Sequence, residues 1–289
     1  MRKIIDTVIE TVIFICAILS IIFVVLIFGF LFKEGFAFFK DFGITKFITG
    51  KFWNPSSNPA LFGILPLIVG STLVTVGACV IAVPIGVMTA LYISEIAPKG
   101  IRDILKSLVE LMAAIPSVVI GFVGMITLVP FVRIFFNIPT GLTAFSGSIM
   151  LAFMAMPTIV TISEDAIRSV PWHYKEGAFA LGATKWQTIR RIVLKAAMPG
   201  IIAAIMLGIG RVIGETMAVM MITGNAAHIP DSIFEPVRTM TATIAAEMGE
   251  TVRGDMHYKA LFAIGLVLFV ITFIVNFIAD LFLGKSKNK

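Results

Sequence analysis

Charged residues are scarce in this chain of 289 residues. Asp, Glu, Lys and Arg make up only 14% of it, against about 25% in typical soluble domains. Hydrophobic residues make up 58%, and the mean hydropathy is +1.01. A water-soluble protein of this size cannot cover that much apolar surface. The scarcity of charge therefore excludes a soluble enzyme and a disordered chain, and it places most of the protein in lipid.

Cysteine and histidine are also scarce, which bears on metal and redox chemistry. The two cysteines, Cys16 and Cys79, both lie inside apolar runs, a pattern typical of small buried hydrophobes and not of a disulfide or a metal pair. The three histidines, His173, His228 and His257, are scattered along the chain. No Cys/His cluster has the spacing of a metal site. The sequence thus predicts no metal and no cofactor on this chain.

A nucleotide-binding loop is missing as well. A P-loop requires Gly, four residues and then Gly-Lys-Ser/Thr, so that backbone N–H groups surround the phosphates. Only Gly284-Lys285-Ser286 approaches this pattern, and Ala279 stands where the first glycine is required. We therefore expect no ATP hydrolysis and no catalytic residue on this chain.

What the sequence does contain is six long apolar runs. A membrane helix needs about 20 mostly apolar residues, and the runs cover approximately 11–32, 64–93, 108–132, 142–162, 199–223 and 261–283. The first run is too long for a signal-peptide core, so we expect a retained anchor. The fold class predicted is an all-α integral membrane protein with six transmembrane helices, in which a peripheral first helix accompanies a five-helix core.

Long polar segments suggest the domain boundaries. We expect an N-terminal anchor helix with an outer linker over 1–62, a transmembrane domain over 63–283, and a tail over 284–289. Fourteen of the 23 Lys and Arg residues fall on one side if both termini are cytoplasmic, and eight fall on the other. Since cytoplasmic loops are enriched in Lys and Arg, the N and C termini are predicted to be cytoplasmic. The net charge of +6 then requires no nucleic-acid partner.

The segment 163–198 is too long for an ordinary connection between bundle helices. Pro171 is suited to start a short helix and Gly182 to end it. Thr184 and Gln187 have the spacing of a capping box that begins a second helix. Two short helices hinged at Gly182 are therefore predicted to project into the cytoplasm and to bind a protein partner. The alternative is an amphipathic helix that lies on anionic lipid.

This segment resembles a motif in the membrane subunits of binding-protein-dependent ABC importers. That motif is Glu-Ala-Ala, three residues, Gly, nine residues, Ile, one residue and Leu-Pro. Here the spacing is kept, with Gly177 in place of the first Ala and Lys195 in place of the Pro. The resemblance implies a coupling helix that docks on a separate ATPase, which binds ATP and magnesium. The residues that it assigns to coupling are Glu176, Gly177, Ala178, Leu181, Gly182 and Ala183.

Two charged residues interrupt the fifth apolar run. Arg211 and Glu215 are four residues apart, which places them on one face of a continuous helix. A charge near the middle of a membrane costs roughly 2.5–3.5 kcal/mol on insertion scales, and an arginine fork suits oxyanions. We therefore predict a pathway for a small anion, in which Glu215 holds Arg211 when the site is empty. The alternative is a structural ion pair that locks helix packing.

Five short phrases resemble the C-type permease subunits of phosphate importers. They are FWNP at 52–55, GILP at 63–66, AIPSVVIG at 114–121, MPTIVTISED at 156–165 and GETMAV at 214–219. The resemblance implies a prokaryotic cell-membrane complex with an A-type permease subunit, an ATPase homodimer and an extracytoplasmic phosphate-binding protein. It also places four residues in the phosphate pathway, namely Arg211, Glu215, Gly214 and Thr216.

Several alternatives remain open at this point. The outer segment 226–258 contains an expected amphipathic helix over 236–249, ended by Gly249. It is interpreted as a lid, a docking surface for the binding protein, or a merely solvated loop. Other oxyanions, namely molybdate, sulfate and tungstate, remain alternatives to phosphate as the substrate of such an importer. A proton-coupled secondary anion transporter that uses Glu215, or a passive anion channel, would also place charge inside the membrane.

Overall fold

The computed structural model describes residues 2–287, and these are mostly helical. The described residues contain a two-stranded antiparallel sheet, which pairs β1 (Trp53–Asn54) with β2 (Leu61–Phe62). The α-helices are α1 (Arg2–Phe42), α2 (Ile44–Thr49), α3 (Leu65–Leu91), α4 (Lys99–Ala114), α5 (Ser117–Phe135), α6 (Ala144–Arg168), α7 (Trp172–Ala180), α8 (Lys185–Thr188), α9 (Leu194–Gly214), α10 (Met217–Ile222), α11 (Met240–Glu247) and α12 (Met256–Lys287). The described residues also form two short π-helices, η1 (Tyr92–Ile96) and η2 (Ile189–Val193), and one 3-10 helix, η3 (Met248–Glu250).

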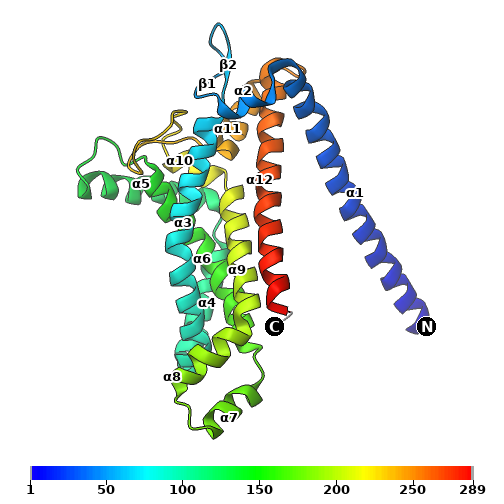
Figure 1. Cartoon of the computed structure of the whole chain (residues 1–289), viewed down its shortest axis with the longest axis vertical. Coiled ribbons are helices and arrows are strands. Elements are labelled where there is room, and N and C mark those ends of the chain that lie inside the picture. Colours follow the sequence, from blue (N-terminus) through cyan, green and yellow to red (C-terminus); the bar gives the residue numbers. More distant parts are fainter. Residues whose placement is uncertain (1, 288–289) are drawn as a thin grey trace.

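Helices α3, α6, α9 and α12 form an upright bundle, and α1 leaves it at the end opposite to α7 and diverges downward (Figure 1). Following the predicted topology, we call this end the outer end and the end that carries α7 the inner end. The centre of the bundle uses small residues, which let helices approach closely. Ile159 of α6 packs against Gly86 of α3 and Gly208 of α9, and a Cβ at either glycine would collide with it. Close packing of these three helices therefore depends on residues that contribute almost no side-chain volume.

Within residues 2–287, six helices are long and apolar enough to cross a membrane, which confirms the predicted number. In Figure 1 the first turn of α1 and the last turn of α12 lie toward the same end of the molecule as α7, as the predicted topology requires. Which side of the membrane that end faces stays a prediction. Residues 284–287 of the predicted tail extend α12, and residues 288–289 lie outside the described residues.

The third span is present as α5, but its predicted bounds, 108–132, are wrong, because the span begins only at Ser117. Ile115 and Pro116 are extended, so that α4 ends before them and α5 begins after them. The reason is local: proline disfavours helical backbone in the residue that precedes it. Helix α5 then leaves the bundle sideways (Figure 1). Hydropathy alone does not detect this break, because apolar residues continue on both sides of it.

Helix α4 is held against α6 by an ion pair. Lys106 donates a hydrogen bond to Glu164 Oε2 at 3.0 Å, and the Glu164 side chain is only 3% exposed. This hydrogen bond raises the pKa of Lys106, which keeps the ammonium charged. The pair therefore fixes the inner ends of α4 and α6 relative to each other.

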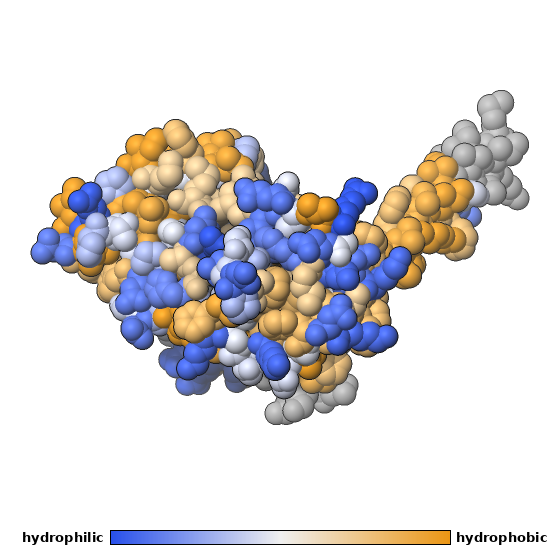
Figure 2. All heavy atoms as spheres, turned by 90° about the horizontal axis from the view of Figure 1, so that it is seen from above, coloured by the Kyte–Doolittle hydropathy of each residue, from blue (hydrophilic) through white to orange (hydrophobic). Residues whose placement is uncertain are grey.

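The outer end of the molecule is polar over its centre, whereas the diverging α1 is hydrophobic (Figure 2). There Glu247 of α11 accepts hydrogen bonds from three partners on different segments of the chain. They are Arg238 at 2.7 Å, His257 at 2.8 Å and the indole nitrogen of Trp53 at 3.1 Å. Glu247 thus joins the linker that follows α1 to α11 and to the start of α12.

We expect Glu247→Ala to lower the thermal stability of the purified protein. Arg238 and Trp53 are largely buried, so the change leaves donors without acceptors, at a cost of about 2 kcal/mol. Thermal unfolding in detergent measures the effect as a drop of several degrees. Glu250→Ala, in the adjacent exposed turn, is the control with little expected change. Equal unfolding temperatures for the two variants would show that the network contributes nothing.

Candidate functional site

The fifth span breaks at the predicted charge pair. Helix α9 ends at Gly214, and Glu215 is extended, with φ −69° and ψ 134°. The carboxylate of Glu215 accepts a hydrogen bond from the backbone N–H of Ala218 at 3.2 Å, in the first turn of α10. The expectation that Arg211 and Glu215 share one helix face is therefore wrong. Glycine loses the most backbone entropy in a helix, and Glu215 stabilises the new helix that starts beyond it.

Arg211 consequently has no carboxylate to neutralise it. It is exposed, and it forms no ion pair within residues 2–287. In Figure 1, α9 ends below the outer ends of α3 and α12, and Arg211 lies in the last turn of α9. The alternative of a structural pair with Glu215 is thus contradicted. A charge at this depth needs an aqueous path, a substrate or another subunit.

Hydroxyl groups surround the backbone break. With Glu215 they line a cavity of about 10 Å³, large enough for about one water molecule. The Thr241 hydroxyl donates to the Glu215 carbonyl oxygen at 2.8 Å, and the N–H of Met240 donates to the Ser71 hydroxyl at 3.0 Å. The hydroxyl-bearing residues of this cavity are Ser71 and Thr75 of α3 and Thr239 and Thr241 at the start of α11.

The outer segment therefore reaches into the bundle. Met240, Ala242 and Thr243 are at most 2% exposed, so that the interpretation of this segment as a merely solvated loop is wrong for α11. Gly249 does not end this helix but lies within η3, and the helix begins at Met240 and not near residue 236. Whether α11 acts as a lid or a docking surface stays a prediction.

Gly214 and Thr216 lie on the exposed side of the break. The Thr216 hydroxyl donates to the Gly214 carbonyl oxygen at 3.2 Å, and a Cβ at Gly214 would meet no atom within 4 Å. Three of the four predicted pathway residues, Glu215, Gly214 and Thr216, therefore form the break itself, and Arg211 precedes it by one turn. The sequence patterns did not indicate Ser71, Thr75, Thr239 and Thr241. Hydroxyl residues spaced four apart in an apolar span were the available signal for the first two.

The predicted coupling helix is present as α7. Gly182 has φ +77°, which favours glycine, and two hydrogen bonds close the helix end. The N–H of Gly182 donates to the Phe179 carbonyl at 2.9 Å, and the N–H of Ala183 donates to the Ala178 carbonyl at 3.0 Å. Thr184 and Gln187 form the predicted capping box. The helix runs from Trp172 to Ala180, as the caps predicted to within one residue.

The second helix of this segment is not a separate element. Helix α8, the π-helical η2 and α9 form one continuous helix from Lys185 to Gly214. The segment between Lys185 and Pro199 contains no proline or glycine, and Pro199 itself lies inside α9. The π-helical η2 is a local change of helical turn within this continuous helix. The fifth span is thus longer at its inner end than predicted, and α7 alone projects between α6 and this span.

The residues assigned to coupling fall into two groups. Leu181 at the tip is 90% exposed, and Glu176, Gly177 and Gly182 are also exposed. Ala178 is buried and Ala183 is half-buried. Four of the six residues are therefore available to a partner, whereas Ala178 holds α7 against its own chain. The exposed aromatic side chains on this surface are Trp172, Tyr174, Phe179 and Trp186.

Comparison with known proteins supports one family. Residues 82–287 match the family described as binding-protein-dependent transport system inner membrane component. The chain is 41% identical to a probable ABC transporter permease protein, YqgH, of Bacillus subtilis, over 90% of this chain and 84% of that protein. It is 37% identical to the phosphate transport system permease protein PstC of Mesorhizobium japonicum, over 86% of this chain and 81% of that protein.

A solved structure has the same fold. The chain matches a bacterial alginate ABC transporter, determined in complex with an alginate pentasaccharide-bound periplasmic protein, with a TM-score of 0.63. The match covers 93% of this chain and 92% of that chain at 19% identity. At this identity the likeness establishes the fold, and it confirms the predicted all-helical architecture of an ABC importer permease.

Proposed function

Because this chain belongs to the family of binding-protein-dependent transport system inner membrane components, we propose that it is the transmembrane permease subunit of an ATP-driven phosphate importer. One observation carries the choice of an anion: Arg211 is exposed and unpaired within residues 2–287, one turn before a helix break that serine and threonine hydroxyls line. Guanidinium and hydroxyl groups donate hydrogen bonds to oxyanions. The phosphate transport permease among its relatives supports phosphate as the anion.

The partners follow from this assignment. An A-type permease subunit completes the pathway, a homodimeric ATPase binds ATP and magnesium, and an extracytoplasmic binding protein delivers phosphate. The termini and α7 face the cytoplasm, and the polar outer end in Figure 2 faces the binding protein. The structure in which a related permease fold occurs together with a periplasmic protein supports such an assembly.

The mechanism uses two sites: the helix break near Arg211 and Glu215, and helix α7 at the inner end of the molecule. ATP binding draws the ATPase subunits together, and α7 passes this movement to the bundle. The pathway then changes from outward to inward access. Arg211 gives the anion a transient charge-assisted contact, while Glu215 interacts with a protonated oxyanion and repels a fully ionised one. Affinity at this site is low, since a tight site would retain the anion.

Purification of the complex tests this assignment against transporters of another class. We expect the tagged chain, expressed in its native operon context and solubilised in mild detergent, to capture an ATPase and a second permease subunit. A proton-coupled secondary transporter or a channel needs neither partner. Anion transport that persists without any ATPase and responds to a proton gradient would contradict the proposal.

A further inference from the structure

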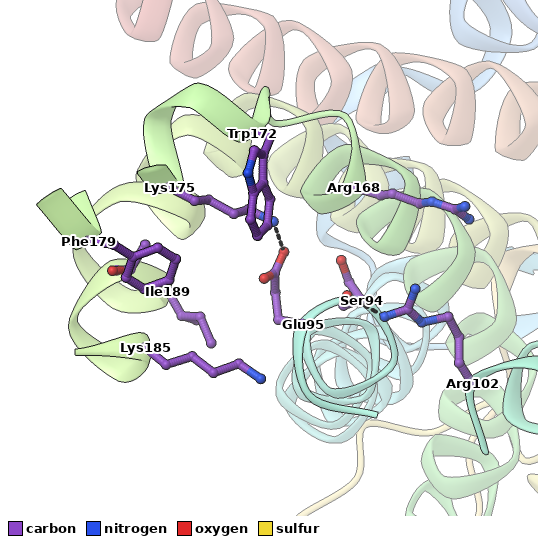
Figure 3. A pocket seen from close by; sticks show the side chains of 10 residues that line it. Ser94, Glu95, Arg102, Arg168, Trp172, Lys175, Phe179, Lys185 and Ile189 are labelled. Atoms are coloured by element: carbon purple, nitrogen blue, oxygen red, sulfur yellow. Dashed lines mark hydrogen bonds and ion pairs between the residues drawn. The ribbon is translucent and has the colours of Figure 1, made fainter. Parts of the chain in front are cut away.

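Helix α7 is attached to the rest of the chain by few contacts. Only Ala178 is buried among its residues, and most of its large side chains are exposed. One charged residue of this helix differs from the others, because its side chain points inward. Lys175 is only 12% exposed at its side chain, and it reaches toward the inner end of α3 (Figure 3). The connection that it makes is therefore a main physical link between α7 and the bundle.

Lys175 forms a short ion pair with Glu95. Its Nζ lies 2.6 Å from Glu95 Oε1, and the Glu95 side chain is 10% exposed. The same Nζ lies 5.5 Å from the centroid of the Trp172 ring, which covers the pair on one side. An exposed ion pair is weak because water screens it, whereas removing one partner of a buried pair leaves an uncompensated charge. The Lys175–Glu95 pair is buried, so that removing either partner leaves an uncompensated charge.

Glu95 is itself firmly placed. It belongs to η1, the π-helical continuation of α3, and π-helical segments are frequent at functional sites. Arg102 of α4 donates hydrogen bonds to the carbonyl oxygens of Ile93 at 2.9 Å and of Ser94 at 3.0 Å. A force on the Glu95 carboxylate therefore acts on the inner end of α3 and, through Arg102, on α4.

A cavity of about 490 Å³ lies beside the ion pair. It is lined from one side by η1, α4 and the end of α6 at Arg168, and from the other by α7, α8 and η2. Figure 3 shows Lys175 and Glu95 meeting between these two groups of elements, with Lys185 at the edge. The space leaves α7 room to move relative to α3, so that the ion pair bridges two parts that are otherwise poorly packed there.

We propose that Lys175 and Glu95 form a strut through which displacement of α7 by the ATPase moves the inner end of α3. This inference rests on the proposed function, because it takes α7 as the coupling helix. Lys175 and Glu95 are positioning residues, since neither touches the transported anion nor the nucleotide. Without the strut, α7 moves on ATP binding while α3 lags behind, and hydrolysis is no longer converted into transport.

The test compares charge reversals in the complete importer reconstituted in proteoliposomes with its binding protein. Radiolabelled phosphate uptake and ATP hydrolysis are measured on the same sample, and their ratio gives the coupling. We expect Lys175→Glu and Glu95→Lys each to lower uptake per ATP at least about tenfold, and the double variant to return to within about threefold of the unmodified complex. Lys185→Glu reverses a charge at the same cavity without an ion pair in the described chain, and it should leave the ratio unchanged.

The outcomes separate the strut from the wider assignment. An unmodified complex that takes up no phosphate contradicts the proposed function, not the strut. Single variants with normal coupling, or a double variant no better than the single ones, overturn the strut. Where a reversal prevents assembly, Glu95→Gln decides, because the amide keeps the shape and an acceptor oxygen. Its assembled complex should lose at least about threefold in coupling, and a normal ratio in that complex would also overturn the strut.

Discussion

Replacing Arg211 with Gln abolishes phosphate uptake, lowering it by at least about a hundredfold, while the importer still assembles. Hydrogen bonds to charged groups contribute about 1.5–3 kcal/mol each, and an arginine fork offers two to an oxyanion. Losing one such bond and the attraction of the charge therefore corresponds to about two powers of ten. Assembly is spared because Arg211 is exposed and forms no ion pair within residues 2–287.

The measurement is initial uptake of radiolabelled phosphate, normalised to the amount of complex purified from the same cells. Arg253→Gln is the matched control, since Arg253 is an exposed arginine of the outer loop. Arg211→Lys keeps the charge without the planar fork, and we expect an intermediate rate. Uptake that survives in Arg211→Gln would show that Arg211 has a structural role and that the anion passes elsewhere.

Leu181→Asp removes the ATPase from the purified complex. Leu181 is 90% exposed at the tip between α7 and the Gly182 turn, so that no contact within the described chain explains a leucine there. Apolar residues at the centre of an interface often contribute 2 kcal/mol or more, and a buried unpaired carboxylate adds a further cost. We expect capture of the ATPase to fall at least about tenfold.

Val252→Asp is the control for this change, because Val252 is 74% exposed on the outer loop at the opposite end of the molecule. The same pair of variants distinguishes a protein partner from a lipid surface. If α7 lies on anionic lipid, Leu181→Asp leaves ATPase capture unchanged and the docking assignment is contradicted. If both variants lose the ATPase equally, the effect is general instability and not docking.

The features that could be predicted from the sequence are those decided by local chemistry. The number of membrane spans in the described residues follows from apolar length, because lipid offers no partner for exposed backbone groups. The ends of α7 follow from Gly182, Thr184 and Gln187, which satisfy helix-end hydrogen bonds with near neighbours. These signals need no knowledge of how the helices pack.

The features that could not be predicted depend on contacts between distant segments or on competing local signals. The spacing of Arg211 and Glu215 implies a shared face only if the helix continues, and it stops at Gly214. Met240 meets Ser71 across 169 residues of sequence, and no periodicity in either segment indicates that contact. The Lys175–Glu95 pair likewise joins segments 80 residues apart. Sequence patterns therefore singled out Arg211, whose place in the pathway stays a prediction, but they did not indicate what surrounds the helix break.

The most direct test of the phosphate assignment is competition in the reconstituted importer. Radiolabelled phosphate uptake is measured with ATP present or absent, and with an excess of unlabelled phosphate, molybdate, sulfate or tungstate. We expect uptake that requires ATP and the binding protein, and that only unlabelled phosphate suppresses strongly. Strong suppression by one of the other oxyanions together with its own ATP-dependent uptake, or phosphate uptake that continues without ATP, would contradict an ATP-driven phosphate permease.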